Sequence, residues 1–234
     1  MTTLRDRLAG IEERIVAACR RAGRERSSVR LMAVSKTHPA EAICAAAEAG
    51  LTLFGENRVQ EFESKRAGLP GGIEVHLIGH LQSNKAAKAA AIFSAIDSVD
   101  SLRLLERLND AADEAKGRLP VLLEMKLSVE AAKTGFDPAG DELSVALERA
   151  ADLSGVEVRG LMTIAPLDED PETARACFRR LQELREELAR RYSRVRLDEL
   201  SMGMSGDFEI AIEEGSTVVR IGTAIFGARE YSAR

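Results

Sequence analysis

Aromatic residues are scarce in this chain: they make up 4% of its 234 residues, and tryptophan is absent. The core must therefore be aliphatic, and the hydrophobic residues, at 45%, are numerous enough to form one. No apolar run approaches the roughly 18 to 20 residues that a membrane-spanning helix needs. The N-terminus is rich in charge and lacks an apolar stretch, which argues against a signal peptide. We therefore expect no membrane partner.

Cysteine is also rare, and no charge of one sign dominates. The three cysteines, Cys19, Cys44 and Cys177, lie far apart, and their odd number argues against a disulfide framework. We expect each to be a small buried residue on a helical face, in a reducing compartment. The 33 basic and 38 acidic residues give a net charge of −5, which gives no indication of a nucleic-acid partner. These features indicate a soluble, cytoplasmic protein.

What the chain does contain is a regular alternation of amphipathic helical segments and short apolar runs. Apolar spacing predicts a helix from Leu4 that Gly23 ends, and another that starts at Asp170-Pro171 and reaches Tyr192. Eight apolar runs have the length of strands: 29–35, 51–54, 74–78, 92–99, 120–127, 156–163, 197–202 and 217–221. Such alternation is typical of parallel sheets built from βαβ units.

The number of these units predicts the architecture. Eight of them in this length indicate an α/β fold, a single (β/α)8 TIM barrel with an extra N-terminal helix, occupying residues 1–234 as one domain. An open doubly wound sheet is the alternative. A parallel barrel carries its chemistry at the C-terminal ends of its strands. The residues that directly follow each apolar run are therefore the candidates for a functional site.

Small and polar residues follow the last two strands. Ser201 to Gly206 come after the seventh, and Gly222-Thr223 after the eighth. The loops after strands seven and eight are the recurrent phosphate site of this fold, and a helix beginning near Ser205 would offer its positive end to an anion. The alternative is that Ser201 and Ser205 form only a turn and a helix cap.

Lys36 is the sharpest single candidate, because it directly follows the apolar run LMAVS. A lysine in a site of low dielectric constant has a depressed pKa and can form a Schiff base. Combined with a phosphate site, it suggests a pyridoxal phosphate (PLP) protein or an aldolase acting on a phosphorylated sugar. The alternative is that its side chain extends into solvent at a strand end.

Arg220 favours PLP over the aldolase. It lies inside the eighth apolar run, where an unpaired guanidinium is costly, so it needs an acceptor. The pyridine nitrogen of PLP is one such partner. The alternative is a salt bridge to an acid of the barrel such as Glu56. His76 and His80 lie four residues apart on a strand, hence roughly 13 Å apart at about 3.3 Å per residue, and cannot share a metal ion.

Five segments that run through nearly the whole chain carry a stronger signal. They are AVSKTHP (33–39), FGENRVQE (54–61), HLIGHLQSNK (76–85), GLMTIAP (160–166) and LSMGMSGDFEIAIEEGSTVVRIGTAIFG (200–227). These segments resemble the pyridoxal phosphate homeostasis protein family, whose barrel is of the alanine racemase N-terminal-domain type. The resemblance implies that Lys36 holds PLP covalently as a Schiff base and that Arg220 meets the pyridine nitrogen.

The resemblance also implies the rest of the site. The implied cofactor-binding residues are Lys36, Asn57, Ser201, Met204, Ser205, Arg220, Gly222 and Thr223. Among them, Ser201, Gly222 and Thr223 are expected to hold the phosphate, with a contribution from Met204 or Ser205. No catalytic residue and no metal ligand is implied.

The implied function is PLP binding in vitamin B6 homeostasis, without an established catalytic reaction. An always-charged Arg220 disfavours protonation of the PLP ring and so weakens its use as an electron sink. Only Tyr192 and Tyr231 could supply a tyrosine acid/base. We therefore expect a carrier and not an enzyme, with a PLP-dependent amino-acid racemase or lyase as the alternative. We expect a monomer that meets PLP-dependent apoenzymes transiently.

Overall fold

Eight parallel strands form a closed barrel in which each strand pairs with its neighbours in chain order and β8 returns to β1. The computed structural model describes residues 2–112, 117–127 and 134–227. The strands are β1 (Arg30–Val34), β2 (Leu53–Glu56), β3 (Glu74–Leu77), β4 (Ala95–Val99), β5 (Leu119–Glu124), β6 (Val156–Met162), β7 (Glu199–Ser201) and β8 (Val218–Ile221). All eight predicted strands are present, and the open doubly wound sheet is excluded.

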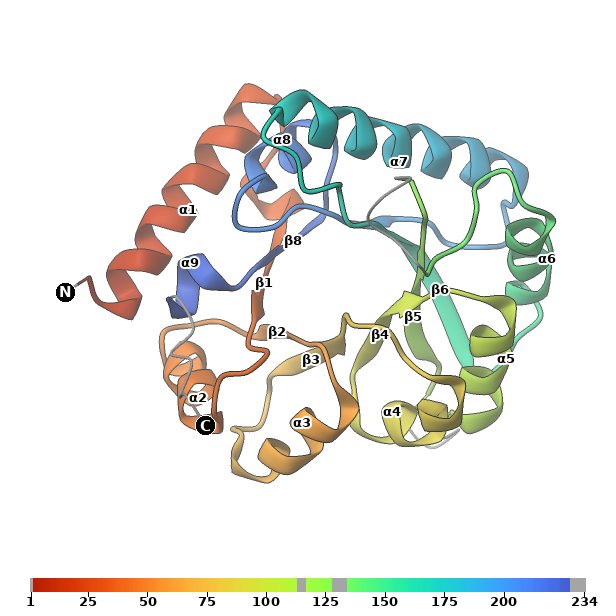
Figure 1. The fold of residues 1–234 in the computed structure, drawn as a ribbon, viewed down its shortest axis with the longest axis horizontal. Helices are drawn as coiled ribbons and strands as arrows, with labels where there is room; N and C mark the ends of the chain where they lie inside the picture. Colours follow the sequence, from red (N-terminus) through yellow and green to blue (C-terminus); the bar gives the residue numbers. More distant parts are fainter. Residues whose placement is uncertain (1, 113–116, 128–133, 228–234) are drawn as a thin grey trace.

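Helices surround the barrel, as Figure 1 shows in a view along its axis. They are α1 (Leu4–Arg21), α2 (Ala40–Glu48), α3 (Val59–Lys65), α4 (Ala86–Ile92), α5 (Leu102–Ala111), α6 (Asp141–Ala150), α7 (Pro171–Arg191), α8 (Phe208–Glu213) and α9 (Thr223–Phe226). The predicted N-terminal helix is confirmed. It packs beside α8 and α9, so the first and last parts of the chain close the ring together.

The ends of the two long helices follow from local chemistry. Thr3 and Asp6 form a capping box at the start of α1, and Gly23, with φ of 64°, follows its C-terminus. A positive φ costs glycine little, so it is suited to end a helix. The Asp170 side chain accepts the Glu172 N–H at 3.0 Å at the start of α7, as the Asp-Pro signal predicted.

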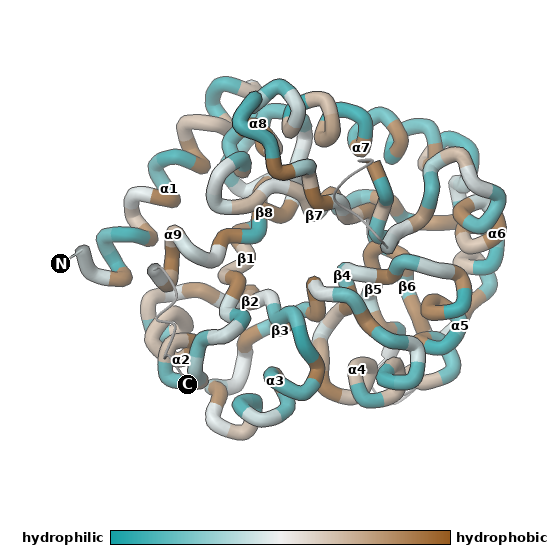
Figure 2. The backbone as a smooth tube through the Cα atoms, viewed as in Figure 1, coloured by the Kyte–Doolittle hydropathy of each residue, from teal (hydrophilic) through white to brown (hydrophobic). Residues whose placement is uncertain are grey.

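The core lies between the strands and the helices. The face predicted for α7 is buried: Ala174, Cys177, Phe178, Leu181, Leu184 and Leu188. The mixed colours along α7 in Figure 2 reflect this amphipathic pattern. Every residue of β2, β4 and β8 is buried, as expected for strands covered on both faces. Cys19 and Cys177 are buried as predicted, whereas Cys44 is only half-buried, so the prediction for Cys44 was too strong.

Several predicted boundaries differ from the structure. β5 ends at Glu124 and not at 127, and β2 runs from Leu53 through Glu56, which is completely buried. β4 begins at Ala95, because Ile92 is the last residue of α4. The helix expected near Ser205 begins only at Phe208, since a turn occupies the preceding residues.

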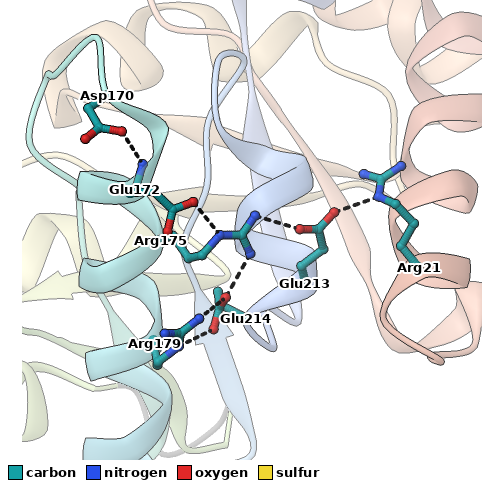
Figure 3. Close-up of polar contacts among 7 residues, drawn as sticks. All are labelled: Arg21, Asp170, Glu172, Arg175, Arg179, Glu213 and Glu214. Atoms are coloured by element: carbon teal, nitrogen blue, oxygen red, sulfur yellow. Dashed lines mark hydrogen bonds and ion pairs between the residues drawn. The ribbon is translucent and has the colours of Figure 1, made fainter.

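An ion-pair network fixes α8 to its two neighbouring helices (Figure 3). Arg175 of α7 lies 2.9 Å from both Glu213 and Glu214 at the end of α8. Arg179 adds a second contact to Glu214 at 3.1 Å, and Arg21 of α1 lies 2.7 Å from Glu213. The network therefore fixes the end of α8 that leads into β8. None of the described helices is long and apolar enough to cross a membrane.

Candidate cofactor site at the barrel mouth

Lys36 lies where the sequence placed it, at the C-terminal rim of the barrel. It follows β1 by two residues, in a turn, and its side chain is half-buried. β1 lies between β2 and β8, with Met32 paired to Arg220 and Ala33 to Ile221. This register places the residues after β8, Gly222 and Thr223, beside the segment that carries Lys36. Lys36 and the predicted phosphate loop after β8 are therefore neighbours in space.

Arg220 points into the barrel and is almost fully buried, with 4% of its surface exposed. Its Nη1 donates to the Ser201 hydroxyl at 2.8 Å, and its Nη2 donates to the Thr163 carbonyl at 2.8 Å. Both partners are neutral, and no carboxylate of the described residues lies within 4.0 Å of the guanidinium. Burial lowers the pKa of Arg220, while the more distant charges of Asp97 and other acids oppose that shift.

The alternative of a salt bridge between Arg220 and Glu56 is wrong. Glu56 lies 2.7 Å from the Lys65 ammonium and accepts the Ser35 hydroxyl, outside the barrel wall and beneath α3. Burial raises the pKa of Glu56, although both contacts favour its charged form. Sequence reasoning missed Lys65 completely. The signal that could have found it is its spacing of four residues from Glu61 on a helical segment.

A series of hydrogen-bonded side chains continues inward from Arg220 through Ser201 and Asp97 to His76. The sequence did not predict that these residues interact. A guanidinium only donates hydrogen bonds, so the Ser201 oxygen accepts from it and keeps its own proton for Asp97, 3.5 Å away. The other oxygen of Asp97 lies 3.0 Å from His76 Nδ1. Burial opposes the charge of His76, but Asp97 and Glu74 outweigh it and raise the pKa of His76 to about 9.

These contacts settle where Ser201 lies. It is completely buried, and its hydroxyl is shared between Arg220 and Asp97. Its part in a phosphate cradle stays a prediction. Sequence reasoning treated His76 only as a residue unable to share a metal with His80. The structure gives each histidine its own acid, since His80 lies 2.8 Å from Asp100.

The loop after β7 is a tight turn. Gly203 has φ of 93°, and a side chain there would bring its Cβ within 2.5 Å of the Ala211 Cβ. Asp207 is at the N-cap position of α8, but its side chain accepts the N–H of Met204 in the loop, at 2.5 Å, and makes no hydrogen bond to the helix. The expected helix end at Ser205 is therefore absent, which corrects that part of the prediction. Met204 and Ser205 are half-buried at this rim.

The loop after β8 is shorter and more open. Gly222 is half-buried and Thr223 is exposed, directly at the start of α9. A Cβ on Gly222 would meet the Val34 carbonyl at 3.2 Å, so this glycine allows β8 to lie close to β1. The first N–H groups of a helix have no partner within the helix. This segment therefore presents backbone donors and a hydroxyl at the same rim as Lys36.

Two further side chains belong to the same end of the barrel. Asn57, directly after β2, is half-buried, and its backbone packs closely against Gly79. Glu124, the last residue of β5, is 7% exposed, and sequence reasoning did not single it out. Burial raises its pKa, and the charge of Arg220 acts in the opposite direction.

Tyr192 and Tyr231 are the two tyrosines that could supply an acid/base at this site. Tyr192 ends α7 on the outer layer, where it packs on the core and not in the barrel. Because the helices run antiparallel to the strands, this end of α7 is the end of the barrel opposite to Lys36. Tyr231 lies outside the described residues.

Comparison with known proteins gives a consistent result. Residues 7–230 match the family described as alanine racemase, N-terminal domain. A pyridoxal phosphate homeostasis protein from Aquifex aeolicus is 44% identical over 227 residues, covering 97% of this chain and 98% of its own.

Solved structures agree with this relationship. PipY from Synechococcus elongatus, solved with PLP bound, is 42% identical, with a TM-score of 0.84 over 96% of this chain and 100% of its own. An alanine racemase from Clostridium difficile is similar in fold alone, at 14% identity, with a TM-score of 0.71 over 98% of this chain and 57% of its own.

Proposed function

Because the chain belongs to the pyridoxal phosphate homeostasis protein family, we propose that it binds PLP at the C-terminal rim of its barrel. The observation that carries this assignment is the adjacency of β1 and β8. It brings Lys36 beside Gly222 and Thr223, with Arg220 in the barrel wall below. A reactive lysine, a buried cation and a polar loop with backbone donors thus share one rim. The role in PLP homeostasis follows from the family.

The residues present fit PLP at the amine end of the site. Lys36 is half-buried in the turn after β1, at the rim where a ligand could meet its amine. When bound, the aldehyde of PLP supplies the carbon to which the Lys36 amine attaches, with loss of one water molecule. We propose that Lys36 holds PLP covalently in this way. The task of the chain is to direct the Lys36 amine toward the bound ligand.

Arg220 fits the opposite end of the ligand. Its two hydrogen-bond partners are a hydroxyl and a carbonyl, so no acid of the described residues neutralises its positive charge by direct contact. A ring nitrogen that keeps its lone pair is a good acceptor for such a group. Because a guanidinium stays charged, Arg220 donates to this nitrogen and leaves it unprotonated.

The phosphate belongs at the loops after β7 and β8, the usual position in this fold. We propose Gly222 and Thr223 as its main donors, with Met204 and Ser205 at its edge and Asn57 on the side of β2. Ser201 contributes by holding Arg220. Mutation of Ser201 can test whether it also contacts the phosphate directly.

We propose further that the chain holds and exchanges PLP and does not catalyse amino-acid chemistry. Two features support this: Arg220 weakens the electron sink, and Tyr192 lies at the far end of α7 from the site. A carrier of this kind acts as one domain over residues 1–234, as a monomer, and meets PLP-dependent apoenzymes transiently. A racemase or lyase is the competing function.

The experiment that tests the binding site is absorbance after incubation with PLP. The wild type should develop the visible band of lysine-bound PLP, and Lys36→Ala should lose it. Lys88→Ala, at an exposed ion pair with Glu63 on neighbouring helices, is the matched control and should keep the band. Borohydride reduction followed by peptide mass spectrometry should place the label on Lys36. A colourless wild type with no labelled peptide would overturn the proposal.

The competing function needs a separate measurement. A racemase or lyase would exchange the α-hydrogen of amino acids for deuterium at a rate that depends on Lys36. No exchange above that of Lys36→Ala is the result expected for a carrier.

A further inference from the structure

The turn that carries Lys36 has an unusual backbone. His38 N–H donates to the Ser35 carbonyl at 3.0 Å, so Lys36 and Thr37 are its two central residues. Thr37 has φ of 67°, and it is the one described residue other than glycine with a positive φ. A β-branched residue in this conformation is an outlier that persists only where the surroundings enforce it. Something outside the turn must therefore hold it.

Helix α3 supplies that hold through two side chains one helical turn apart. Glu61 accepts the Thr37 N–H in the middle of the turn. Lys65 donates to the carbonyls at its two ends, at 3.2 Å for Ser35 and 3.0 Å for His38. Glu61 and Lys65 also lie 3.2 Å from each other. The backbone on both sides of Lys36 is thus attached to one helix.

Lys65 is itself anchored from below. Its side chain is 9% exposed and lies 2.7 Å from the completely buried Glu56. The same carboxylate oxygen accepts the Ser35 hydroxyl at 2.5 Å. The second oxygen of Glu56 is buried with no hydrogen-bond partner among the described residues. The Lys65 ammonium is therefore the direct compensation for a buried carboxylate.

These contacts also exclude Lys65 as a ligand-binding residue. An ammonium has three protons and no acceptor, and four oxygens lie within 3.2 Å of this one. No donor is left for a ligand. Ser35 and Glu56 meet Lys65 on the helix side of the barrel wall, whereas Lys36 lies in the turn after β1 at the rim.

We propose that Lys65 is a positioning residue that sets the reactivity of Lys36 by fixing the Ser35–His38 turn. The inference rests on the proposed covalent site at Lys36. Glu61 and Glu56 assist, the first by holding Thr37 and the second by holding Lys65. The charged, three-proton geometry of the ammonium is what the role requires, since it must reach two carbonyls and a carboxylate together.

The test measures the reactivity of Lys36 with and without PLP. In the PLP-free protein, acetylation of Lys36 by acetic anhydride is followed by mass spectrometry over a range of pH. With PLP, the rate constant for appearance of the visible band is measured per mole of folded protein. Lys65→Met should slow both reactions by about tenfold, the factor that a loss of about 1.4 kcal/mol produces. Lys65→Arg should recover part of the rate.

Two further variants keep the test decisive. Lys88→Met removes an exposed lysine that pairs with Glu63 of α3 at 2.6 Å, and it should leave both rates unchanged. The double variant Glu56→Gln/Lys65→Met leaves no unpaired buried charge, so it should fold better than Lys65→Met and still react slowly. Wild-type rates in folded Lys65→Met or in the double variant would overturn the inference. Absence of a visible band in the wild type, together with slower acetylation in Lys65→Met, would instead reject PLP and keep Lys65 as a positioning residue.

Discussion

The Arg220 guanidinium and the Ser201 hydroxyl lie 2.8 Å apart inside the barrel, with the donor on Arg220. This contact joins β8 to β7 and leaves the Ser201 proton for Asp97 on β4. The Thr163 carbonyl, at the end of β6, holds the second terminal nitrogen. A flexible side chain is thereby fixed in one position before any ligand arrives. Preorganisation of this kind lowers the ordering cost of binding.

Arg220→Lys should therefore show whether PLP binding depends on the positive charge at this position or on the geometry of the guanidinium. Lysine keeps the positive charge but cannot reach Ser201 and Thr163 together and still face a ring nitrogen. We expect PLP affinity to fall about tenfold or more, because hydrogen bonds to charged groups contribute about 1.5–3 kcal/mol. Equilibrium titration of the visible band measures the change. The visible band itself should survive, since Lys36 is intact.

The matched control for this substitution is Arg159→Lys. Arg159 pairs with Glu157 at 2.8 Å near the start of β6, away from Lys36, and lysine can keep this contact. Its PLP affinity should equal that of the wild type. Equal losses of affinity in both variants would contradict a specific role for Arg220.

A second prediction concerns His76, whose pKa Asp97 and Glu74 raise to about 9 against the effect of burial. A raised pKa in the folded state stabilises the protein below the unfolded value of 6.5, and this stabilisation is lost as pH rises through about 9. His76→Gln should therefore lower the free energy of unfolding at pH 6 by on the order of 3 kcal/mol, at about 1.4 kcal/mol per pKa unit. The difference from the wild type should shrink toward pH 10.

Urea unfolding at a series of pH values measures this difference. His80→Gln is the control, because His80 is exposed and its pair with Asp100 is expected to contribute at most about 1 kcal/mol. A His76→Gln deficit that stays constant from pH 6 to pH 10 would show that His76 contributes no charge.

Much of the fold could be predicted because the spacing of apolar residues along the sequence indicates which side chains are buried. The apolar stripe of α7 is the buried one, and β8, which is apolar apart from Arg220, is buried along its whole length. The positions of Lys36 and Arg220 followed from the same reasoning, since strand ends converge at one rim. Their adjacency needed the closure of the barrel between β1 and β8.

The rest depended on contacts that local sequence does not encode. Lys65 looked like an ordinary helix-surface lysine, and its burial arises only because α3 lies over Glu56 and the Ser35–His38 turn. The chain from Arg220 to His76 joins residues up to 144 positions apart through side chains of four strands. The late start of α8 was missed because a turn over residues 205–207 precedes it, in which Asp207 accepts the Met204 N–H.

A third prediction tests the strain next to Lys36. Thr37, with φ of 67°, occupies a region that asparagine adopts at lower cost than a β-branched residue. Thr37→Asn should raise the free energy of unfolding by about 0.5–1 kcal/mol, because asparagine relieves part of a strain that costs on the order of 1–3 kcal/mol. Thr52→Asn, at an exposed position without a positive φ, is the control and should change little. A loss of stability in Thr37→Asn would mean that the threonine side chain itself holds the turn.

The last prediction concerns the network that holds α8. Arg175 is 24% exposed at its side chain and contacts Glu213, Glu214 and, at 3.2 Å, Glu172 (Figure 3). Removing it leaves two half-buried carboxylates at the end of α8 with fewer partners. Arg175→Met should therefore lower the free energy of unfolding by about 1–2 kcal/mol, more than an exposed pair contributes. The loss should shrink in 1 M salt, where the Debye length is only about 3 Å.

Arg194→Met provides the comparison that makes this prediction specific. Arg194 and Asp152 form a single pair at 2.6 Å in which both side chains are 70% exposed. Each ion of such a pair remains hydrated, so its loss should change stability by less than about 0.5 kcal/mol. Thermal melts of the two variants at low and high salt measure the contrast. If Arg175→Met and Arg194→Met lose the same small amount of stability, the ion pairs of Arg175 contribute no more to holding α8 than an exposed pair does.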